Sequence, residues 1–158
     1  MRKLFIVLLF LSVASVSFSQ HIDTLYKKGS DAIKNGEYET ALSYFNVIIS
    51  KSPKESNAYN SIGFIYLMQK NYEKSIVNFS KAIEIEPNYS RALANRGAAY
   101  LMLNDVENSY KDLSQALTIS PNDIVALNSL GTLYGHLGKI NEAIEIFNKA
   151  ENIDPMHV

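Results

Sequence analysis

The chain has 158 residues, a length that suits one domain or a short array of repeats. Its 15 basic and 16 acidic residues give a formal net charge of −1, which excludes a polyanion binder that works by excess Lys and Arg. Because there is no cysteine, thiolate nucleophiles, disulfides and thiolate metal sites are excluded as well.

Residues 1–19 have the layout of a secretory signal peptide. Arg2 and Lys3 precede an apolar run over residues 4–11, and the small residues Ser17 and Ser19 precede a possible cleavage site before Gln20. The apolar run is short for a membrane span of about 20 residues, although residues 13–18 could extend it into an uncleaved anchor. The Ser-Phe-Ser-Gln ending resembles export signals of Gram-negative bacteria. We expect cleavage, a mature chain without a membrane span, and export to the periplasm or cell envelope, or secretion.

The prolines and several glycines after the signal repeat with a period of 34 residues. The two series are Pro53, Pro87, Pro121 and Pro155, and Gly29, Gly63, Gly97 and Gly131. Two residue types that share one period indicate an internal repeat. The period divides the chain into four units, at residues 22–55, 56–89, 90–123 and 124–157.

Within each unit, the spacing of apolar residues predicts two α-helices. In the second unit, Ile62 and Tyr66 share a face of the first helix, and Ile76 and Phe79 share a face of the second. Gly or Asn between the helices supplies a left-handed cap. The proline ends the second helix, because it lacks an N–H and clashes with the preceding turn. Each unit is therefore predicted as helix, tight turn, helix and proline stop.

The residue pattern of these units resembles the tetratricopeptide repeat family. In the fourth unit the matching residues are Leu127, Leu130, Gly131, Tyr134, Ala143, Phe147, Ala150 and Pro155. The resemblance extends over residues 22–157 and is weakest in the first unit. It implies an all-α fold, a right-handed α-solenoid of four 34-residue helix-turn-helix repeats, in which stacked repeats share one elongated core.

Three kinds of residue in this pattern have a structural interpretation. The repeated glycine lets the two helices of a unit approach closely. Repeating tyrosines are expected to fill the core rather than form a ligand cage; they are Tyr66, Tyr100 and Tyr134. Arg96 stands where the other units have Ile62, Leu130 or Lys28. Because an unpaired buried guanidinium would be costly, we predict a structural ion pair with Asp112 on the facing helix.

No catalytic motif is present. The chain lacks a nucleophile elbow, a phosphate loop and a dinucleotide fingerprint. His21, His136 and His157 are isolated, and the acid pair Glu84 and Glu86 lies on different faces of one helix. We therefore expect no enzyme activity, no cofactor, no metal site and no nucleic-acid partner.

The resemblance implies that the first helices of the units line a concave groove that holds a partner's peptide or helix. The predicted groove residues are Tyr26, Asn57, Asn60, Phe64, Arg91, Asn95, Asn128, Thr132 and His136, with Met68 and Met102 one turn further along. Asparagine amides could bond a peptide backbone, and Phe64 would be an apolar anchor. An inert polar surface is the alternative interpretation of the same residues.

Some family members clamp the C-terminal carboxylate of a chaperone with Lys, Asn and Arg side chains. Here Tyr26, Ser30 and Ser61 occupy three of the clamp places, and only Arg91 is a plausible match. Together with the export signal, this argues against a cytosolic chaperone cofactor.

A second candidate surface lies at the last helix. The repeats reach the chain end without an extra polar helix, and repeat arrays usually need a polar cap. The predicted end interface consists of Ile140, Ile144, Phe147 and Ile153. The sequence thus favours a non-catalytic interaction scaffold or adaptor that binds a protein in its groove or at this uncapped helix. The alternative is a self-association module that stacks through its C-terminal repeat, giving a homo-oligomer.

Overall fold

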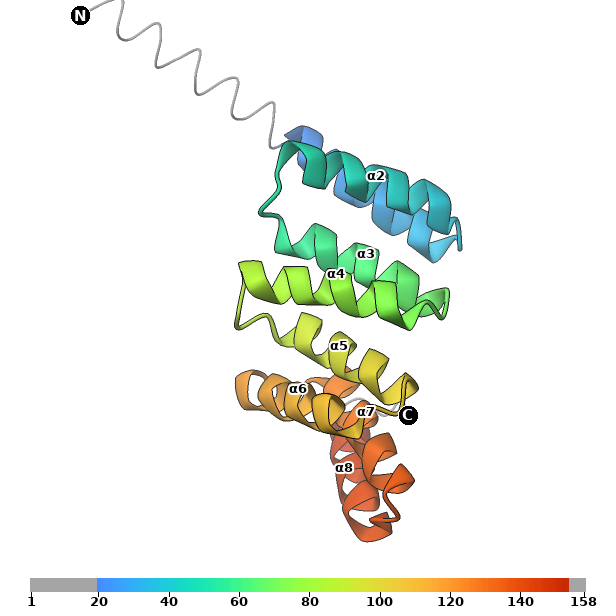
Figure 1. Cartoon of the computed structure of the whole chain (residues 1–158), viewed down its shortest axis with the longest axis vertical. Helices are drawn as coiled ribbons and strands as arrows, with labels where there is room; N and C mark the ends of the chain where they lie inside the picture. Colours follow the sequence, from blue (N-terminus) through green and yellow to red (C-terminus); the bar gives the residue numbers. More distant parts are fainter. Residues whose placement is uncertain (1–19, 154–158) are drawn as a thin grey trace, which may run out of the picture. The chain divides into compact units, whose positions relative to one another are not determined.

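The computed structural model describes residues 20–153, which form two compact units divided between Pro53 and Lys54. All regular secondary structure in this part of the chain is α-helical (Figure 1). The predicted signal peptide over residues 1–19, Pro155 and His157 lie outside the described residues.

The first unit contains one helical hairpin, made of a helix over residues 20–34 and α2 (Tyr38–Lys51). The ring of Phe45 is fully buried, and it lies so close to Gly29 that a Cβ there would approach it to 2.7 Å. Tyr26 meets the same ring edge to face, with the ring centroids 6.0 Å apart. The absence of a side chain at Gly29 therefore allows the close packing of this hairpin.

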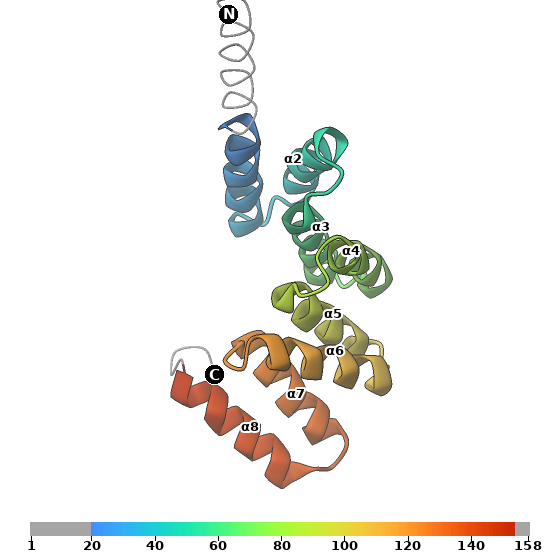
Figure 2. The same ribbon diagram turned by 90° about the vertical axis from the view of Figure 1, so that its left-hand side faces the viewer.

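The second unit contains three hairpins in succession. Their helices are α3 (Ser56–Met68), α4 (Tyr72–Ile85), α5 (Ser90–Met102), α6 (Val106–Ile119), α7 (Ile124–His136) and α8 (Ile140–Ile153). The first helices contact one another, α3 with α5 and α5 with α7, and the second helices α4 and α6 pack on the next first helix (Figures 1 and 2). The three first helices therefore form one layer of this unit.

Glycine has the same packing role in the second unit. A Cβ at Gly63 would come within 2.7 Å of the buried Phe79 ring, and one at Gly97 within 2.8 Å of Leu113. By contrast, a Cβ at Gly135 would meet nothing within 4 Å. The period-34 glycines thus mark close helix approach, as expected, and the unrepeated Gly135 does not.

The turn between the helices of each hairpin has one residue in the left-handed region. These residues are Gly36, Lys70, Asn104 and Gly138, with φ of 75°, 59°, 58° and 72°. At Lys70, the N–H of Asn71 donates to the carbonyl of Tyr66 at 2.8 Å, and the N–H of Lys70 donates to Leu67 at 2.9 Å. This Schellman pattern ends a helix by satisfying its last carbonyls. Glycine or asparagine takes the left-handed position in three of these turns, and lysine takes it in the turn between α3 and α4.

The second helices end where the prolines predict. The last residues of α2, α4 and α6 are Lys51, Ile85 and Ile119, each two positions before Pro53, Pro87 or Pro121. Asp123 caps the following helix α7, since its carboxylate accepts from the N–H of Ala126 at 3.0 Å. A shared apolar core joins the later hairpins, including buried Leu93, Leu113 and Leu133.

Candidate functional site

The predicted ion pair between Arg96 and Asp112 is confirmed. Arg96 donates through Nε to Oδ2 of Asp112 at 2.6 Å and through Nη2 to Oδ1 at 2.9 Å, and Nη1 donates to the Ser80 hydroxyl at 2.9 Å. Burial lowers the pKa of Arg96, but the hydrogen bonds and charge of Asp112 outweigh it and raise that pKa. Asp112 is only 2% exposed, so the pair holds α5 against α6 and is structural.

Eight of the nine predicted groove residues lie on the layer of α3, α5 and α7, and Tyr26 lies in the first unit. Asn60 and Asn95 are buried, and Asn128 is half-buried. We call the exposed side of this layer the first-helix face. The predicted groove residues that are exposed or half-buried on this face are Asn57, Phe64, Met68, Arg91, Met102, Asn128, Thr132 and His136.

The buried asparagines bond to each other rather than standing free for a peptide. Asn95 Nδ2 donates to Asn60 Oδ1 at 3.2 Å, and the two residues are 7% and 8% exposed. Asn57 also has a partner in the protein, because its Oδ1 accepts from the hydroxyl of Tyr89. These amides therefore join adjacent hairpins in this structure, and their bonding to a partner's backbone stays a prediction.

The first-helix face has an unusual distribution of charge. The sequences of α3, α5 and α7 contain no Asp or Glu. Seven acidic residues lie instead on the second helices, namely Glu73, Glu84, Glu107, Asp112, Glu142, Glu145 and Glu151. Four more stand at the helix ends, namely Glu55, Glu86, Asp105 and Asp123. Arg96 is neutralised by Asp112, whereas the exposed Arg91 forms no ion pair with any residue in 20–153. Arg91 is thus an exposed cation of this face, and the carboxylates of Glu86 and Asp123, which accept from Ser56 and Ser90, lie at the same ends of α3 and α5.

Large apolar side chains lie at the opposite end of the same face. Met68 and Met102 are the last residues of α3 and α5, and they are 48% and 58% exposed. Phe64, one turn before Met68, is half-buried. The face is therefore polar and cationic where α3 and α5 begin, and apolar where they end.

The repeating tyrosines contact cations of their own repeats. Lys74, Arg96 and Lys139 lie over the rings of Tyr66, Tyr100 and Tyr134, at 5.4, 5.9 and 5.6 Å from the ring centroids. All three tyrosines are half-buried. These contacts stabilise the hairpins by cation–π attraction, an interaction that the sequence analysis did not identify.

Three of the four residues of the predicted end interface on α8 are exposed, and the fourth is half-buried. Ile140, Ile144 and Ile153 are 57%, 53% and 37% exposed. Phe147 differs, because its ring is half-buried against Gly131 and packs within its own hairpin. The exposed apolar surface of α8 therefore consists of the three isoleucines, with Phe147 between this surface and the hairpin core.

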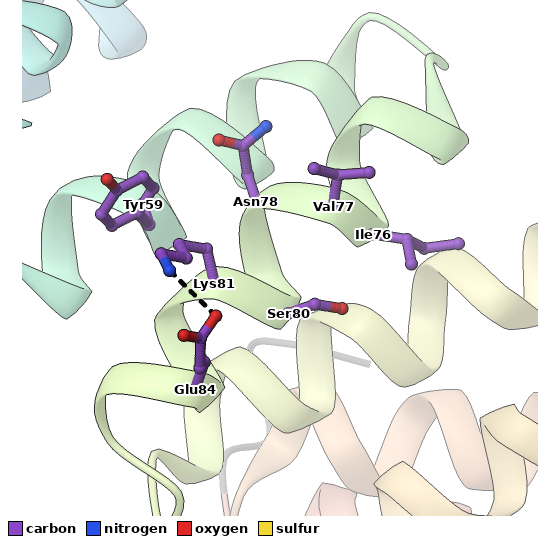
Figure 3. A pocket seen from close by; sticks show the side chains of 7 residues that line it. All are labelled: Tyr59, Ile76, Val77, Asn78, Ser80, Lys81 and Glu84. Carbon is purple, nitrogen blue, oxygen red and sulfur yellow. Dashed lines mark hydrogen bonds and ion pairs between the residues drawn. The ribbon is translucent and has the colours of Figure 1, made fainter.

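A surface pocket of about 510 Å³ lies on the second hairpin (Figure 3). Tyr59 of α3 lines it together with residues of α4, namely Ile76, Val77, Asn78, Ser80, Lys81 and Glu84. Lys81 donates to Glu84 at 2.9 Å, and this hydrogen bond and the Glu84 charge raise the pKa of Lys81. Because Glu84 compensates the charge of Lys81, the pocket has no free charge with which to orient a ligand.

Two further properties bear on the site. Among residues 20–153, no three His, Cys, Asp or Glu side chains are placed together as a metal ion would require. No helix in that part of the chain has both the length and the apolar character needed to cross a bilayer.

The chain is similar to several solved helical-repeat proteins. TTC0263 of Thermus thermophilus superposes with a TM-score of 0.77 at 20% identity, over 86% of this chain and 75% of that one. MamA superposes with a TM-score of 0.72 at 22% identity, over 85% and 78% of the two chains. The first tetratricopeptide domain of Spaghetti (RPAP3), solved with the HSP90 peptide SRMEEVD, has a TM-score of 0.71 at 25% identity, over 76% and 95%. The predicted all-α helical-repeat solenoid is thereby confirmed.

None of the curated protein sequences compared with the chain matches it. Family models of the tetratricopeptide repeat, in contrast, match residues 23–55, 56–89, 78–109 and 124–157. The match over residues 78–109 extends from α4 into α6 and overlaps the match over 56–89. From these matches and the helical hairpins, we conclude that the chain belongs to the tetratricopeptide repeat family.

Proposed function

We propose that this protein is a non-catalytic interaction scaffold that binds a segment of another protein on its first-helix face. One observation carries the proposal: α3, α5 and α7 contain no acidic residue, and their face presents Arg91, which forms no ion pair within residues 20–153, together with exposed Met68 and Met102. Exposed apolar side chains on a face that also has polar residues are typical of interaction surfaces. The peptide-bound domain of Spaghetti (RPAP3), which has the same fold, supports this kind of binding.

We also propose that the protein works after export, in the periplasm or envelope of a Gram-negative bacterium. The charged, apolar and small-residue segments of residues 1–19 support this proposal. Mass spectrometry of the processed protein would test it, since cleavage before Gln20 leaves a defined new N-terminus.

Affinity capture from envelope fractions tests the scaffold proposal. The bait is the full chain, expressed with its own N-terminal segment, and the variant combines Arg91→Gln with Met102→Ser. The matched control combines Lys111→Gln with Val77→Ser, which change an exposed cation and an exposed apolar residue of the second helices. We expect captured proteins to be lost with the first variant and kept with the control. Equal capture by both variants would overturn the proposal.

A second function, self-association through α8, is favoured by the exposure of Ile140, Ile144 and Ile153. In α4 the residue equivalent to Phe147 is Phe79, and in α6 it is Leu113; both are fully buried, whereas Phe147 is half-buried. The helix that covers α4 is α5, and the helix that covers α6 is α7. A second copy that covers α8 in a similar way would remove its exposed apolar surface from water.

A further inference from the structure

Four positions of each second helix lie on one side of that helix, because they are spaced by four, four and three residues. We call each set of four the outer stripe of its helix. The outer stripes are Tyr72, Ile76, Ser80 and Ile83 in α4, Val106, Tyr110, Ser114 and Leu117 in α6, and Ile140, Ile144, Asn148 and Glu151 in α8. All four members are half-buried in α4 and three are half-buried in α6, whereas all four are exposed in α8.

The outer stripes of α4 and α6 are covered by the first helix of the following repeat. Arg96 of α5 donates through Nη1 to the Ser80 hydroxyl at 2.9 Å, and Ile83 packs against the apolar core of the later hairpins. On α7, burial raises the pKa of Tyr134, and a hydrogen bond with Tyr110 of α6 raises it further. Figure 2 shows α8 as the last helix of this unit. A first helix is therefore the element that fits an outer stripe.

The helix over residues 20–34 is the first helix that no described repeat precedes. Its residues at the places of Ala92, Arg96 and Ala99, which lie on one side of α5, are Thr24, Lys28 and Asp31. Both alanines are fully buried and Arg96 is half-buried, whereas Thr24, Lys28 and Asp31 are all exposed. One end of the array thus has an uncovered first helix, and the other end has an uncovered outer stripe.

The two uncovered surfaces have charged residues of opposite sign at places that are apolar inside the array. Glu151 stands where the outer stripes of α4 and α6 have Ile83 and Leu117. Lys28 stands where α7 has Leu130. Neither Glu151 nor Lys28 forms an ion pair with any residue in 20–153. The charges are therefore available to each other in a contact between two copies.

The packing of α5 on α4 gives the register of such a contact. Lys28 would face Asn148, as Arg96 faces Ser80. Glu151 lies one turn beyond Asn148 on the same stripe, at about 5–6 Å between Cβ atoms, which is within the reach of a lysine side chain. Asp31 would face the first turns of α8, where the helix dipole favours a carboxylate.

The remaining charged residues of the two helices add no repulsion to this register. On α8, Glu142, Glu145 and Lys149 lie outside the outer stripe. Lys27 takes the place of Asn95 and would face α7, which contains no Asp, Glu, Lys or Arg. Asp23 and Lys34 take the places of Arg91 and Met102, which are exposed on the first-helix face.

We propose that copies of the chain stack head to tail, with the helix over residues 20–34 of one copy on the outer stripe of α8 of the next and Lys28 paired with Glu151. This inference rests on the proposed self-association through α8. A two-fold contact between two α8 stripes would bury Glu151 without a cation from either stripe, which is costly. A head-to-tail contact joins two different surfaces, so it adds further copies unless the chain of copies closes into a ring.

Mixing two blocked variants tests the direction of stacking. Ile144→Glu blocks the outer stripe of α8, and Thr24→Glu with Lys28→Glu blocks the first helix by placing two carboxylates against Glu151. Each variant of the full chain, expressed with its own N-terminal segment, is expected to be monomeric alone in multi-angle light scattering. An equimolar mixture should form a 1:1 dimer and nothing larger, because one intact surface remains on each variant. The parent chain should grow beyond a dimer as its concentration rises.

Charge reversal tests the pair itself. Lys28→Glu and Glu151→Lys should each weaken association about tenfold, and both together should restore it, because the charges are then exchanged. Lys111→Glu, which reverses an exposed cation outside the outer stripe of α6, should leave association unchanged. Lys28 also lies over the ring of Tyr44, so thermal melts check that its variants are folded. Glu151→Lys leaves that contact intact and tests the pair independently.

Three results would overturn the inference. A parent chain that is monomeric at high micromolar concentration refutes self-association together with the stacking mode. A parent chain that associates to the same extent after Lys28→Glu and after Glu151→Lys refutes the head-to-tail contact but leaves self-association in place. The same conclusion follows if the parent chain associates and the two blocked variants form no 1:1 complex.

Discussion

Arg96 and Asp112 occupy the positions that Leu130 and Ile146 fill one repeat later. Leu130 is 6% exposed and Ile146 packs against the apolar core, so the same place is occupied by an ion pair in one hairpin and an apolar contact in the next. A buried ion pair gains little over well-packed apolar residues, because removing both charges from water is costly. Removing only one partner is more damaging, since it leaves a charge without compensation.

These relations give a prediction about stability. Asp112→Ala should lower the free energy of unfolding by about 3–5 kcal/mol, because Arg96 then loses its carboxylate in a largely buried place. The double variant Arg96→Leu with Asp112→Ile copies the pair of the following repeat and should recover most of this loss. Urea denaturation followed by circular dichroism measures both. A double variant as unstable as Asp112→Ala would show that the ion pair contributes net stability.

The Arg96–Asp112 pair could be predicted from the sequence for a definite physical reason. Its separation of 16 residues is also that of Gly29 and Phe45, and of Gly63 and Phe79, which touch across their hairpins. Within a hairpin, the period and turn length alone determine which residues face each other. The bond between Asn60 and Asn95 joins different hairpins at unequal repeat positions, so it depends on how the hairpins stack. For this reason both asparagines were expected on the open face, and the structure buries them.

At the scale of the elements, the turns between the helices of the four hairpins have the same left-handed geometry, but different residue types adopt it. Lys70 has a φ of 59°, in the region where a β-carbon is crowded by the backbone. Gly36 and Gly138 adopt the same conformation in their turns without that cost. The sequence predicted a left-handed cap in this segment, but it did not indicate that lysine would take the position.

Lys70→Gly should raise the free energy of unfolding by about 1 kcal/mol, because glycine relieves the left-handed strain. The reverse change at the equivalent turn, Gly138→Lys, should lower it by a similar amount. Thermal denaturation monitored at 222 nm compares the two variants with the parent chain. If Lys70→Gly were neutral or destabilising, a favourable interaction of the lysine side chain would have to outweigh the strain.

At the scale of the whole molecule, the self-association function makes a prediction about mass in solution. If α8 is a contact between copies, the chain should be oligomeric at high micromolar concentration, and Ile144→Glu should make it monomeric by placing a charge in that contact. Val77→Glu is the matched control, because Val77 is 67% exposed on α4. Multi-angle light scattering measures all three proteins. A parent chain that is monomeric, or an oligomer that persists in Ile144→Glu, would contradict self-association through α8.

The period of 34 residues, together with the residue pattern that resembles the tetratricopeptide repeat, was sufficient to predict the fold, because each repeat packs only against its neighbours. It could not predict which surfaces stay open. Met68 and Met102 were expected near the groove, but their exposed fractions of 48% and 58% depend on how the hairpins stack. The pocket beside Tyr59 had no sequence signal either, since its lining comes from ordinary surface residues of α3 and α4.

The bonds that cross between hairpins also have a consequence for folding. Hairpins of similar shape can dock on a wrong neighbour, which is a characteristic misfolding route of repeat proteins. If the hairpin of α7 and α8 docked on α3 and α4, Ser129 would take the place of Asn95 beside Asn60, and Leu130 would face Ser80 in place of Arg96. Both hydrogen bonds would be lost. We therefore expect these two hydrogen bonds to favour docking of the correct adjoining repeat over the next one along the chain.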